Sequence, residues 1–224
     1  EEESWGLKAG GRYFVTRNQS SVISFKIPGK DFKGFQIMAS HSDSPAFKIK
    51  ENPEIEAAHC IKLNVEKYGG MICAPWFDRP LSIAGRLVVS EERRLVSKLV
   101  NVDRDLVMIP NLAINMNRQV NDGYDYNATK TMLPVFGSLE AKGTFMSLMA
   151  EAAGVKEEDI LGHDLFLYNR QPGTIWGADE TFLSCGRLDD LKCAFSSVKA
   201  VIEGENSSRV SVAAIFENEE VGRG

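Results

Sequence analysis

The chain has 224 residues, of which 43% are hydrophobic and 25% are charged. This composition is typical of a globular protein and excludes collagen-like, intrinsically disordered and small disulfide-stapled classes. Lysine and arginine number 26 against 31 aspartate and glutamate residues, and the formal net charge of −5 provides no general attraction for nucleic acid or an anionic membrane.

The first forty residues alternate apolar and polar side chains in the manner of β-strands. We expect strands at 12–17, 21–27 and 34–40. His41 and Asp43 follow directly, so a histidine and an aspartate lie at the carboxyl end of the third expected strand.

From about residue 47 to residue 174 the pattern changes to short β-type runs separated by turn residues. Further strands are expected at 61–65, 81–89, 106–109 and 164–168. One helix is predicted at about 138–153, where apolar residues recur at helical spacing and Gly154 can end it. These roughly 125 residues predict a β-rich module of their own.

After Gly173 an α/β pattern returns. An apolar stripe marks one face of a predicted helix: Leu188, Leu191, Phe195, Val198 and Ile202. Its first turn carries Asp189 and Asp190, where the positive end of the helix dipole favours carboxylates. Residues 210–216 form an almost uninterrupted apolar run, typical of a strand buried on both faces of a parallel sheet.

The order of these elements predicts an α/β domain interrupted by a β-rich insertion. We place the first segment of the α/β domain at 1–48, the inserted domain at 49–174 and the second α/β segment at 175–224.

No apolar run approaches the roughly 18–20 residues that span a bilayer, and the acidic start at 1–3 does not resemble a signal peptide. We therefore expect a cytoplasmic protein without a membrane partner. The cysteines form no CxxC pair, so they are expected to be reduced core residues rather than a zinc or redox motif. They are Cys60, Cys73, Cys185 and Cys193.

Open α/β sheets bind ligands outside the carboxyl ends of their strands. Three clusters occupy such positions, and we expect one sheet edge to bring them together: His41 with Asp43, Asp189 with Asp190, and Glu219 with Glu220. One imidazole with several carboxylates suits zinc, manganese or cobalt. A bridging carboxylate can hold two such ions while a neighbouring glutamate stays free as a general base.

Each cluster alone has an ordinary explanation. His41 can be a hydrogen-bonded structural histidine, the two aspartates a charged helix N-terminus, and the two glutamates a solvated loop pair. Together they favour a metal site, because the apolar run at 210–216 gives no reason to end in three acidic side chains unless a cation offsets their repulsion.

Motifs in a definite order connect these clusters: HSDSP at 41–45, GG at 69–70 with WFDR at 76–79 and LSIAGR at 81–86, RLDDL at 187–191 and NEEVG at 218–222. Together with residues 5–18 they resemble the M18 metallo-aminopeptidases, the aspartyl aminopeptidase family. The resemblance implies a catalytic α/β sandwich of the dinuclear zinc aminopeptidase type, with a β-rich dimerisation domain inserted into it and assembly into tetrahedral dodecamers.

The resemblance also implies roles for single residues. His41 is expected to bind one metal ion and Glu220 the other, with Asp189 bridging the two. Glu219 is the expected general base, and Asp43 is expected to orient the imidazole of His41. The cofactors are two divalent ions, with zinc expected and manganese or cobalt also suited to these ligands.

Two further features follow from the same resemblance. Asp190 falls where relatives commonly have asparagine, so it is not expected to bind metal. The family's remaining ligands, an aspartate and a histidine, lie downstream of the NEEVG motif, beyond the end of this sequence.

We therefore predict a metallo-aminopeptidase that removes the N-terminal residue of peptides, preferring aspartate or glutamate, through a metal-bridging water and a glutamate general base. Two alternatives remain open: a dinuclear aminopeptidase for neutral residues, and a noncatalytic oligomeric scaffold. The expected partners are peptide substrates and further copies of the chain, with a dimer as the building block of a dodecamer.

Overall fold

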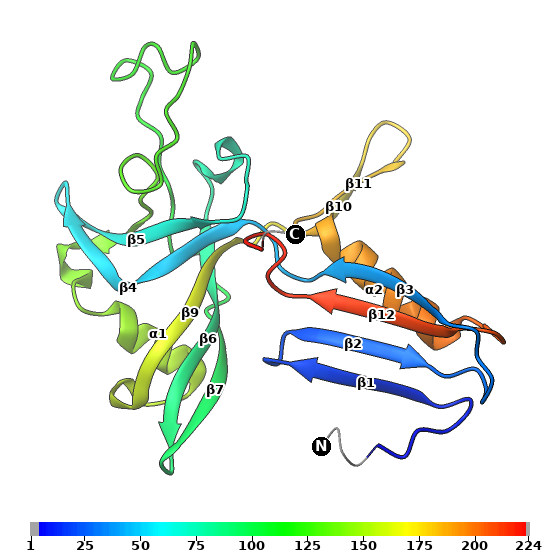
Figure 1. Ribbon diagram of the computed structural model, residues 1–224. Coiled ribbons are helices and arrows are strands. Elements are labelled where there is room, and N and C mark those ends of the chain that lie inside the picture. Colours follow the sequence, from blue (N-terminus) through cyan, green and yellow to red (C-terminus); the bar gives the residue numbers. More distant parts are fainter. Residues whose placement is uncertain (1–4, 223–224) are drawn as a thin grey trace. The chain divides into compact units, whose positions relative to one another are not determined.

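The structure is a computed structural model that describes residues 5–222; residues 1–4 and 223–224, and with them the acidic start at 1–3, lie outside the described part. The chain divides into two compact units, one comprising Glu1–Ser44 and Ile175–Gly224, the other Pro45–Thr174. In the first unit, strands from both ends of the chain lie side by side, as the blue and red ribbons in Figure 1 show. The catalytic and assembly roles expected for segments 1–48, 49–174 and 175–224 stay predictions.

The first unit is built on a four-stranded sheet of order β1-β2-β12-β3 (Figure 1). Its strands are β1 (Arg12–Arg17), β2 (Ser21–Lys26), β3 (Phe35–His41) and β12 (Val210–Phe216). The expected strands 12–17 and 210–216 are confirmed at these bounds. β12 pairs in parallel with β3 but antiparallel with β2, so the sheet is mixed rather than parallel throughout.

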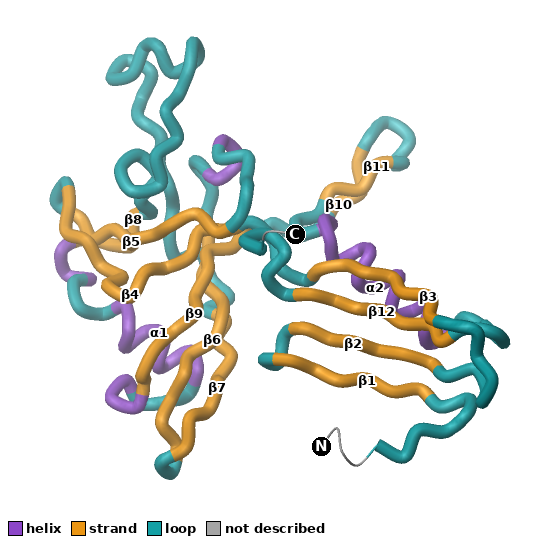
Figure 2. Tube along the Cα trace, in the orientation of Figure 1, coloured by secondary structure: helices purple, strands orange, loops and turns teal. Residues whose placement is uncertain are grey.

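Helix α2 (Leu188–Glu203) packs on one face of this sheet, along β3 and β12 (Figure 2). Its buried residues Ala194, Ser197 and Val201 are small or medium-sized, which lets the helix approach the strands closely. Ser197 Oγ lies 3.4 Å from Ser40 Oγ. The apolar stripe expected from the sequence runs beside this contact, and most of it is exposed: Leu188, Leu191, Phe195 and Ile202.

The opposite face of the sheet is apolar as well. Side chains alternate between the faces of a strand, so the odd-numbered residues of β3 point away from α2. Large apolar side chains on that face are exposed: Ile23, Phe35, Ile37 and Phe216. Trp5 covers another part by stacking on Tyr13 and Phe25. Since α2 is the only helix among the described residues of this unit, this face has no helical layer.

The second unit is a six-stranded sheet of order β7-β6-β9-β4-β5-β8, in which every neighbouring pair is antiparallel. Its strands are β4 (Ala46–Ala57), β5 (Cys60–Tyr68), β6 (Leu81–Glu91), β7 (Arg94–Asn101), β8 (Val135–Ser138) and β9 (Ile160–Asn169). Its core is aliphatic and aromatic, with fully buried Phe47, Ile49, Leu63, Leu81 and Ile83. A short hairpin of β10 (Thr174–Trp176) and β11 (Phe182–Ser184) follows along the chain and, apart from Thr174, belongs to the first unit.

The helix expected at 138–153 is shorter than predicted. α1 spans Phe145–Ala153, and Leu139–Ala141 form a separate 3-10 turn. Gly143, with a φ of 77°, breaks the helical path between them. The Glu54 carboxylate accepts the N–H groups of Gly143 and Phe145, so a distant strand caps the helix. Gly154 ends α1 in the left-handed region, as expected.

Three other expectations can be compared with the structure. Residues 106–109 form isolated bridges rather than a strand. All four cysteines are free, but only Cys73 is buried; Cys185 and Cys193 are exposed, so the expected core position is wrong for these two. Within residues 5–222 no helix is long and apolar enough to cross a membrane.

The outer face of the second unit holds an ion-pair network on neighbouring strands. Asp164 Oδ1 lies 2.8 Å from Lys48 Nζ, and Asp164 Oδ2 lies 3.1 Å from Arg86 Nη2. Burial by itself would raise the pKa of Asp164, but the hydrogen bond and charge of Lys48, with those of Arg86, outweigh burial and lower this pKa below its ordinary value.

We expect Asp164→Asn to lower the free energy of unfolding at pH 7 by about 1–3 kcal/mol, because two cations lose their charged acceptor. Since the pKa of Asp164 is lowered in the folded state, this contribution is present above the unfolded pKa of about 4 and is lost as the pH falls through the folded value. Urea unfolding of the full-length protein and the variant should therefore give curves that converge below about pH 4. A difference that stays constant with pH would contradict this assignment, and exposed Asp179→Asn is the control.

Candidate metal centre

The three clusters meet at one end of the sheet in the first unit. In the parallel pair of β3 and β12, Phe216 lies opposite His41, so the segments that follow the two strands start side by side. The Ser42 N–H donates to Phe216 O at 2.8 Å and extends this pairing beyond the strands. The site therefore forms at the carboxyl ends of parallel strands, where α/β sheets bind ligands.

His41 lies at the centre of the group, with its side chain 13% exposed. Its Nδ1 lies 3.0 Å from the backbone oxygen of Asp43. Its Nε2 faces two carboxylates, 3.5 Å from Asp189 Oδ1 and 3.8 Å from Glu219 Oε2. A proton on Nδ1 satisfies the Asp43 carbonyl and leaves the Nε2 lone pair directed at the carboxylates, the arrangement that a metal-binding histidine needs.

Asp43 connects two of the clusters. Its Oδ1 lies 3.3 Å from His41 Nδ1, and its Oδ2 accepts the backbone N–H of Glu220 at 3.1 Å. The side chain is only 8% exposed, so both contacts form away from solvent. Asp43 thus touches the imidazole, as expected from the sequence, and also holds the turn after β12, which the sequence did not indicate.

The remaining predicted residues complete an open cluster. One potential ligand atom each of His41, Glu219 and Glu220 lies within 4.8 Å of the other two. Asp189 is outside this triad, although its Oδ1 approaches His41 Nε2. The side chains of Asp189 and Glu219 are 94% and 60% exposed, so the cluster is open on the side where further ligands or a substrate would approach.

Crowding of carboxylates gives this cluster the electrostatics of a cation site. Burial raises the pKa of Glu220, and the charges of Glu219, Asp43 and Asp189 raise it further. Burial alone would lower the pKa of His41, but the Asp43 carbonyl and the carboxylates of Glu219, Asp190 and Asp43 outweigh burial and raise it. A divalent cation would relieve this repulsion, and imidazole with carboxylates is a donor set that zinc accepts. The residues therefore fit the expected metal ions.

Asp190 also belongs to the site, although it was not expected to bind metal. Its Oδ2 accepts the backbone N–H of His41 at 3.2 Å. The pKa of Asp190 lies below its ordinary value because the Cys193 thiol, the His41 N–H and the Cys193 N–H donate hydrogen bonds to it, which outweighs burial. Ser44 Oγ donates to the Asp189 carbonyl at 3.4 Å, a second link between the end of β3 and the start of α2.

A contact that the sequence did not indicate supports the turn at 217–220. Ser20 Oγ, in the turn between β1 and β2, donates a hydrogen bond to Glu217 Oε2. The two residues are 197 positions apart, so no local motif could have predicted their contact. The third acidic side chain after β12 is therefore engaged in a protein contact, which leaves Glu219 and Glu220 for the cluster.

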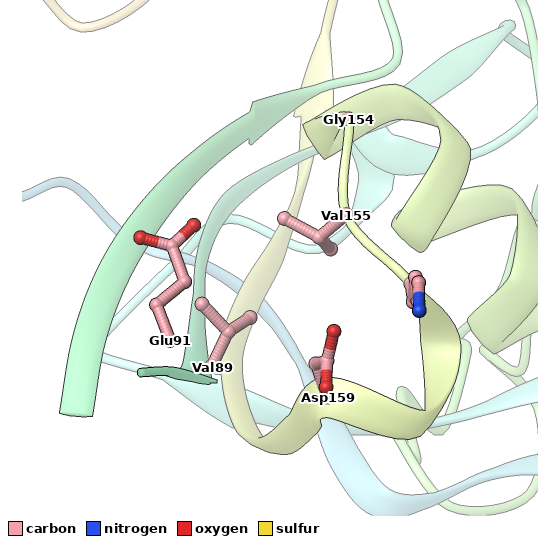
Figure 3. A pocket seen from close by; sticks show the side chains of 6 residues that line it. Val89, Glu91, Gly154, Val155 and Asp159 are labelled. Carbon is pink, nitrogen blue, oxygen red and sulfur yellow. The ribbon is translucent and has the colours of Figure 1, made fainter. Parts of the chain in front are cut away.

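A surface hollow of about 360 Å³ in the second unit has fewer kinds of side chain that could bind metal or catalyse a reaction (Figure 3). Its lining contains the carboxylates Glu91 and Asp159 but no imidazole or thiol. Glu91 is already paired with Lys98, at 2.6 Å. The cluster around His41 is therefore the stronger candidate for a functional site.

The complete chain, residues 1–224, matches the family model described as aminopeptidase I zinc metalloprotease (M18). The chain therefore belongs to the M18 aminopeptidases, a zinc metalloprotease family, as the motifs predicted. It is 43% identical over 232 residues to "Probable M18 family aminopeptidase 2" of Clostridium acetobutylicum, covering 99% of this chain and 53% of that protein. The corresponding protein of Pseudomonas aeruginosa is 35% identical over 230 residues, with the same coverage. The chain spans about half the length of the curated relatives it matches.

Solved structures give the same result. Ape4, in the cryo-EM structure of the Ape4 and Nbr1 complex, matches with a TM-score of 0.89 and 33% identity over 97% of this chain and 47% of that chain. Chaetomium thermophilum mApe1 matches with a TM-score of 0.86 and 29% identity over 96% of this chain and 53% of that chain. The S. cerevisiae mApe1 dodecamer gives a TM-score of 0.76 at 27% identity, covering 95% and 50%. The chain therefore has the fold of about half of an M18 aminopeptidase.

We expect Asp43→Ala to weaken zinc binding by the full-length protein about 10–100-fold, because the change removes the carboxylate beside His41 Nδ1 and releases the backbone N–H of Glu220. Competition with a chromophoric chelator measures the affinity. Asp31→Ala, at an exposed turn carboxylate in the same unit, is the matched control. Equal zinc affinity of the two variants would show that Asp43 does not support the cluster.

Proposed function

We propose that the protein containing this chain is a metal-dependent aminopeptidase that removes the N-terminal residue of peptides and prefers aspartate or glutamate there. The observation that carries the proposal is the convergence of His41, Glu219 and Glu220, with ligand atoms within 4.8 Å, at the carboxyl ends of β3 and β12. Membership of a family described as zinc metalloproteases supports the metal and the reaction.

His41, Asp189 and Glu220 would hold two divalent ions, zinc in the first instance, with Asp189 shared between them. When bound, such ions polarise a carbonyl group and lower the pKa of water. The position of Asp189 supports this role, because its carboxylate lies beside His41 Nε2 and its side chain is 94% exposed, so a second ion could reach it. The curated relatives extend well beyond this chain, and we assign the remaining ligands to that part of the protein.

Glu219 is the residue that would move the proton. It occupies the same cluster as His41 but is the most exposed member of the triad, so its carboxylate can reach water and a bound peptide. As general base it takes a proton from the attacking water, and as general acid it delivers that proton to the leaving amine. Asp43 would keep His41 and the Glu220 turn in place while this occurs.

The uncovered sheet face supports the proposal that the complete catalytic domain is an α/β sandwich. Neighbouring large apolar side chains on one face normally pack against a second layer, yet Phe35, Ile37 and Phe216 are exposed opposite α2. The part of the protein beyond this chain would supply the second layer of an α/β sandwich. The second unit would be the dimerisation domain, in line with the exposed Leu95 and Leu99 on its edge strand β7.

Assembly of copies into a dodecamer is proposed by analogy with the S. cerevisiae mApe1 dodecamer. Peptides and further copies of the chain are thus the proposed partners. Four free thiols are compatible with the expected reducing cytoplasm, which stays a prediction.

We expect Glu219→Gln in the full-length protein to bind zinc normally but to lower kcat by about 10²–10⁴-fold, because the amide cannot accept the proton. Steady-state hydrolysis of aminoacyl-nitroanilides, together with metal analysis, measures both properties. The matched control is Glu205→Gln, an exposed residue before β12. Near-normal turnover by Glu219→Gln would remove Glu219 from the mechanism.

The substrate class can be tested with the same assay. We expect aspartyl- and glutamyl-nitroanilides to have a higher kcat/KM than leucyl- and alanyl-nitroanilides, because the acidic preference follows from the family resemblance. The opposite order would identify an aminopeptidase for neutral residues. No hydrolysis of any substrate by the metal-loaded protein would favour the noncatalytic scaffold.

A further inference from the structure

We infer that Asp190 is a positioning residue that fastens the backbone of His41 to the first turn of α2 and thereby fixes the position of His41 relative to Asp189. The inference rests on the proposed function, since it concerns two of the residues that would hold the metal ions. Asp190 acts through the hydrogen-bond acceptance of its side-chain oxygen and is not itself a ligand.

The first contact joins two distant segments. Asp190 Oδ2 accepts the backbone N–H of His41 at 3.2 Å, across 149 positions of sequence. His41 is the last residue of β3, so its N–H lies where the strand leaves the sheet. This bond therefore anchors the strand end from which the imidazole projects.

The same carboxylate also interacts with its own helix. The thiol and the backbone N–H of Cys193, one turn further along α2, help to hold the pKa of Asp190 below its ordinary value. Carboxylates in the first turn of a helix are stabilised by such free N–H groups. Asp190 itself belongs to α2, so its bond to the His41 N–H connects β3 to this helix through one side chain.

The backbone conformation of this turn directs the side chains of the two neighbouring aspartates to different contacts. Asp189 has φ and ψ of −85° and 111°, and Asp190 has −119° and 21°, so neither follows the regular helix. The Asp189 carboxylate is exposed beside His41 Nε2, whereas the Asp190 carboxylate faces the His41 backbone. Metal sites require ligands held to within about 0.5 Å, so a link that sets the His41 to Asp189 distance bears directly on metal affinity.

The test compares Asp190→Asn, which keeps an acceptor oxygen of the same reach, with Asp190→Ala, which removes it. In the full-length protein we expect Asp190→Ala to weaken Co²⁺ binding about 10–100-fold and to change the visible absorption spectrum of bound Co²⁺. Asp190→Asn should keep the wild-type spectrum and an affinity close to wild type. Asp31→Ala, at an exposed carboxylate of the same unit away from the cluster, is the control.

Hydrogen exchange at the His41 amide, measured on metal-free protein, provides a second readout. We expect protection in the wild type and in Asp190→Asn, and faster exchange in Asp190→Ala. If the alanine variant does not fold, Asp190→Ser replaces it, because the shorter hydroxyl does not reach the His41 N–H.

Two results would overturn the inference. The first is an Asp190→Ala variant with the same His41 amide exchange rate and the same Co²⁺ affinity as the wild type. The second is an Asp190→Asn variant whose Co²⁺ affinity falls as far as that of Asp190→Ala, which would assign the effect to the charge of Asp190. A wild-type protein that binds no metal would instead refute the proposed function, and the exchange measurement would still decide the role of Asp190.

Discussion

The parallel pairing of β3 with β12 is the constraint on which the site depends. It places Phe216 opposite His41, so two segments 175 positions apart, at 41–43 and 216–220, leave the sheet at the same point. The Asp43 carboxylate and the Ser42 N–H then join these segments directly. Burial and the neighbouring carboxylates raise the pKa of Glu220. Burial alone would lower the pKa of His41, but the Asp43 carbonyl and the carboxylates around it outweigh burial and raise it. A divalent cation would relieve the repulsion between these carboxylates.

Much of the fold could be predicted from local pattern. The alternation at 12–17 predicted a strand with the observed bounds because a period of two residues is typical of strands. The apolar run at 210–216 did the same because it is of strand length and too short for a typical buried helix. β4 and β7 were missed because polar and charged residues break their apolar pattern, at 50–54 in β4 and at 97–98 in β7, where pairing with neighbouring strands decides the structure. The start of α1 was misplaced because the cap comes from Glu54, which local sequence cannot reveal.

The residues that form the site could be predicted better than the contacts between them. Strand ends followed by acidic residues and histidine are visible in the sequence, and the structure brings His41, Asp43, Asp189, Glu219 and Glu220 together. The hydrogen bonds from His41 N–H to Asp190 and from Glu220 N–H to Asp43 depend on backbone placement. The same is true of the contact between Ser20 and Glu217, which follows from the turn that β1 and β2 share. Residue types thus indicate the chemistry, and the sheet determines which side chain supports which.

The most direct test of the account is the metal content of the full-length protein, measured by elemental analysis before and after chelation and compared with peptidase activity in the same samples. The account predicts about two zinc ions per chain, loss of N-terminal hydrolysis when they are removed, and recovery when zinc, manganese or cobalt is restored. A folded full-length protein that binds no divalent metal, or that hydrolyses peptides equally well without it, would contradict the central claim.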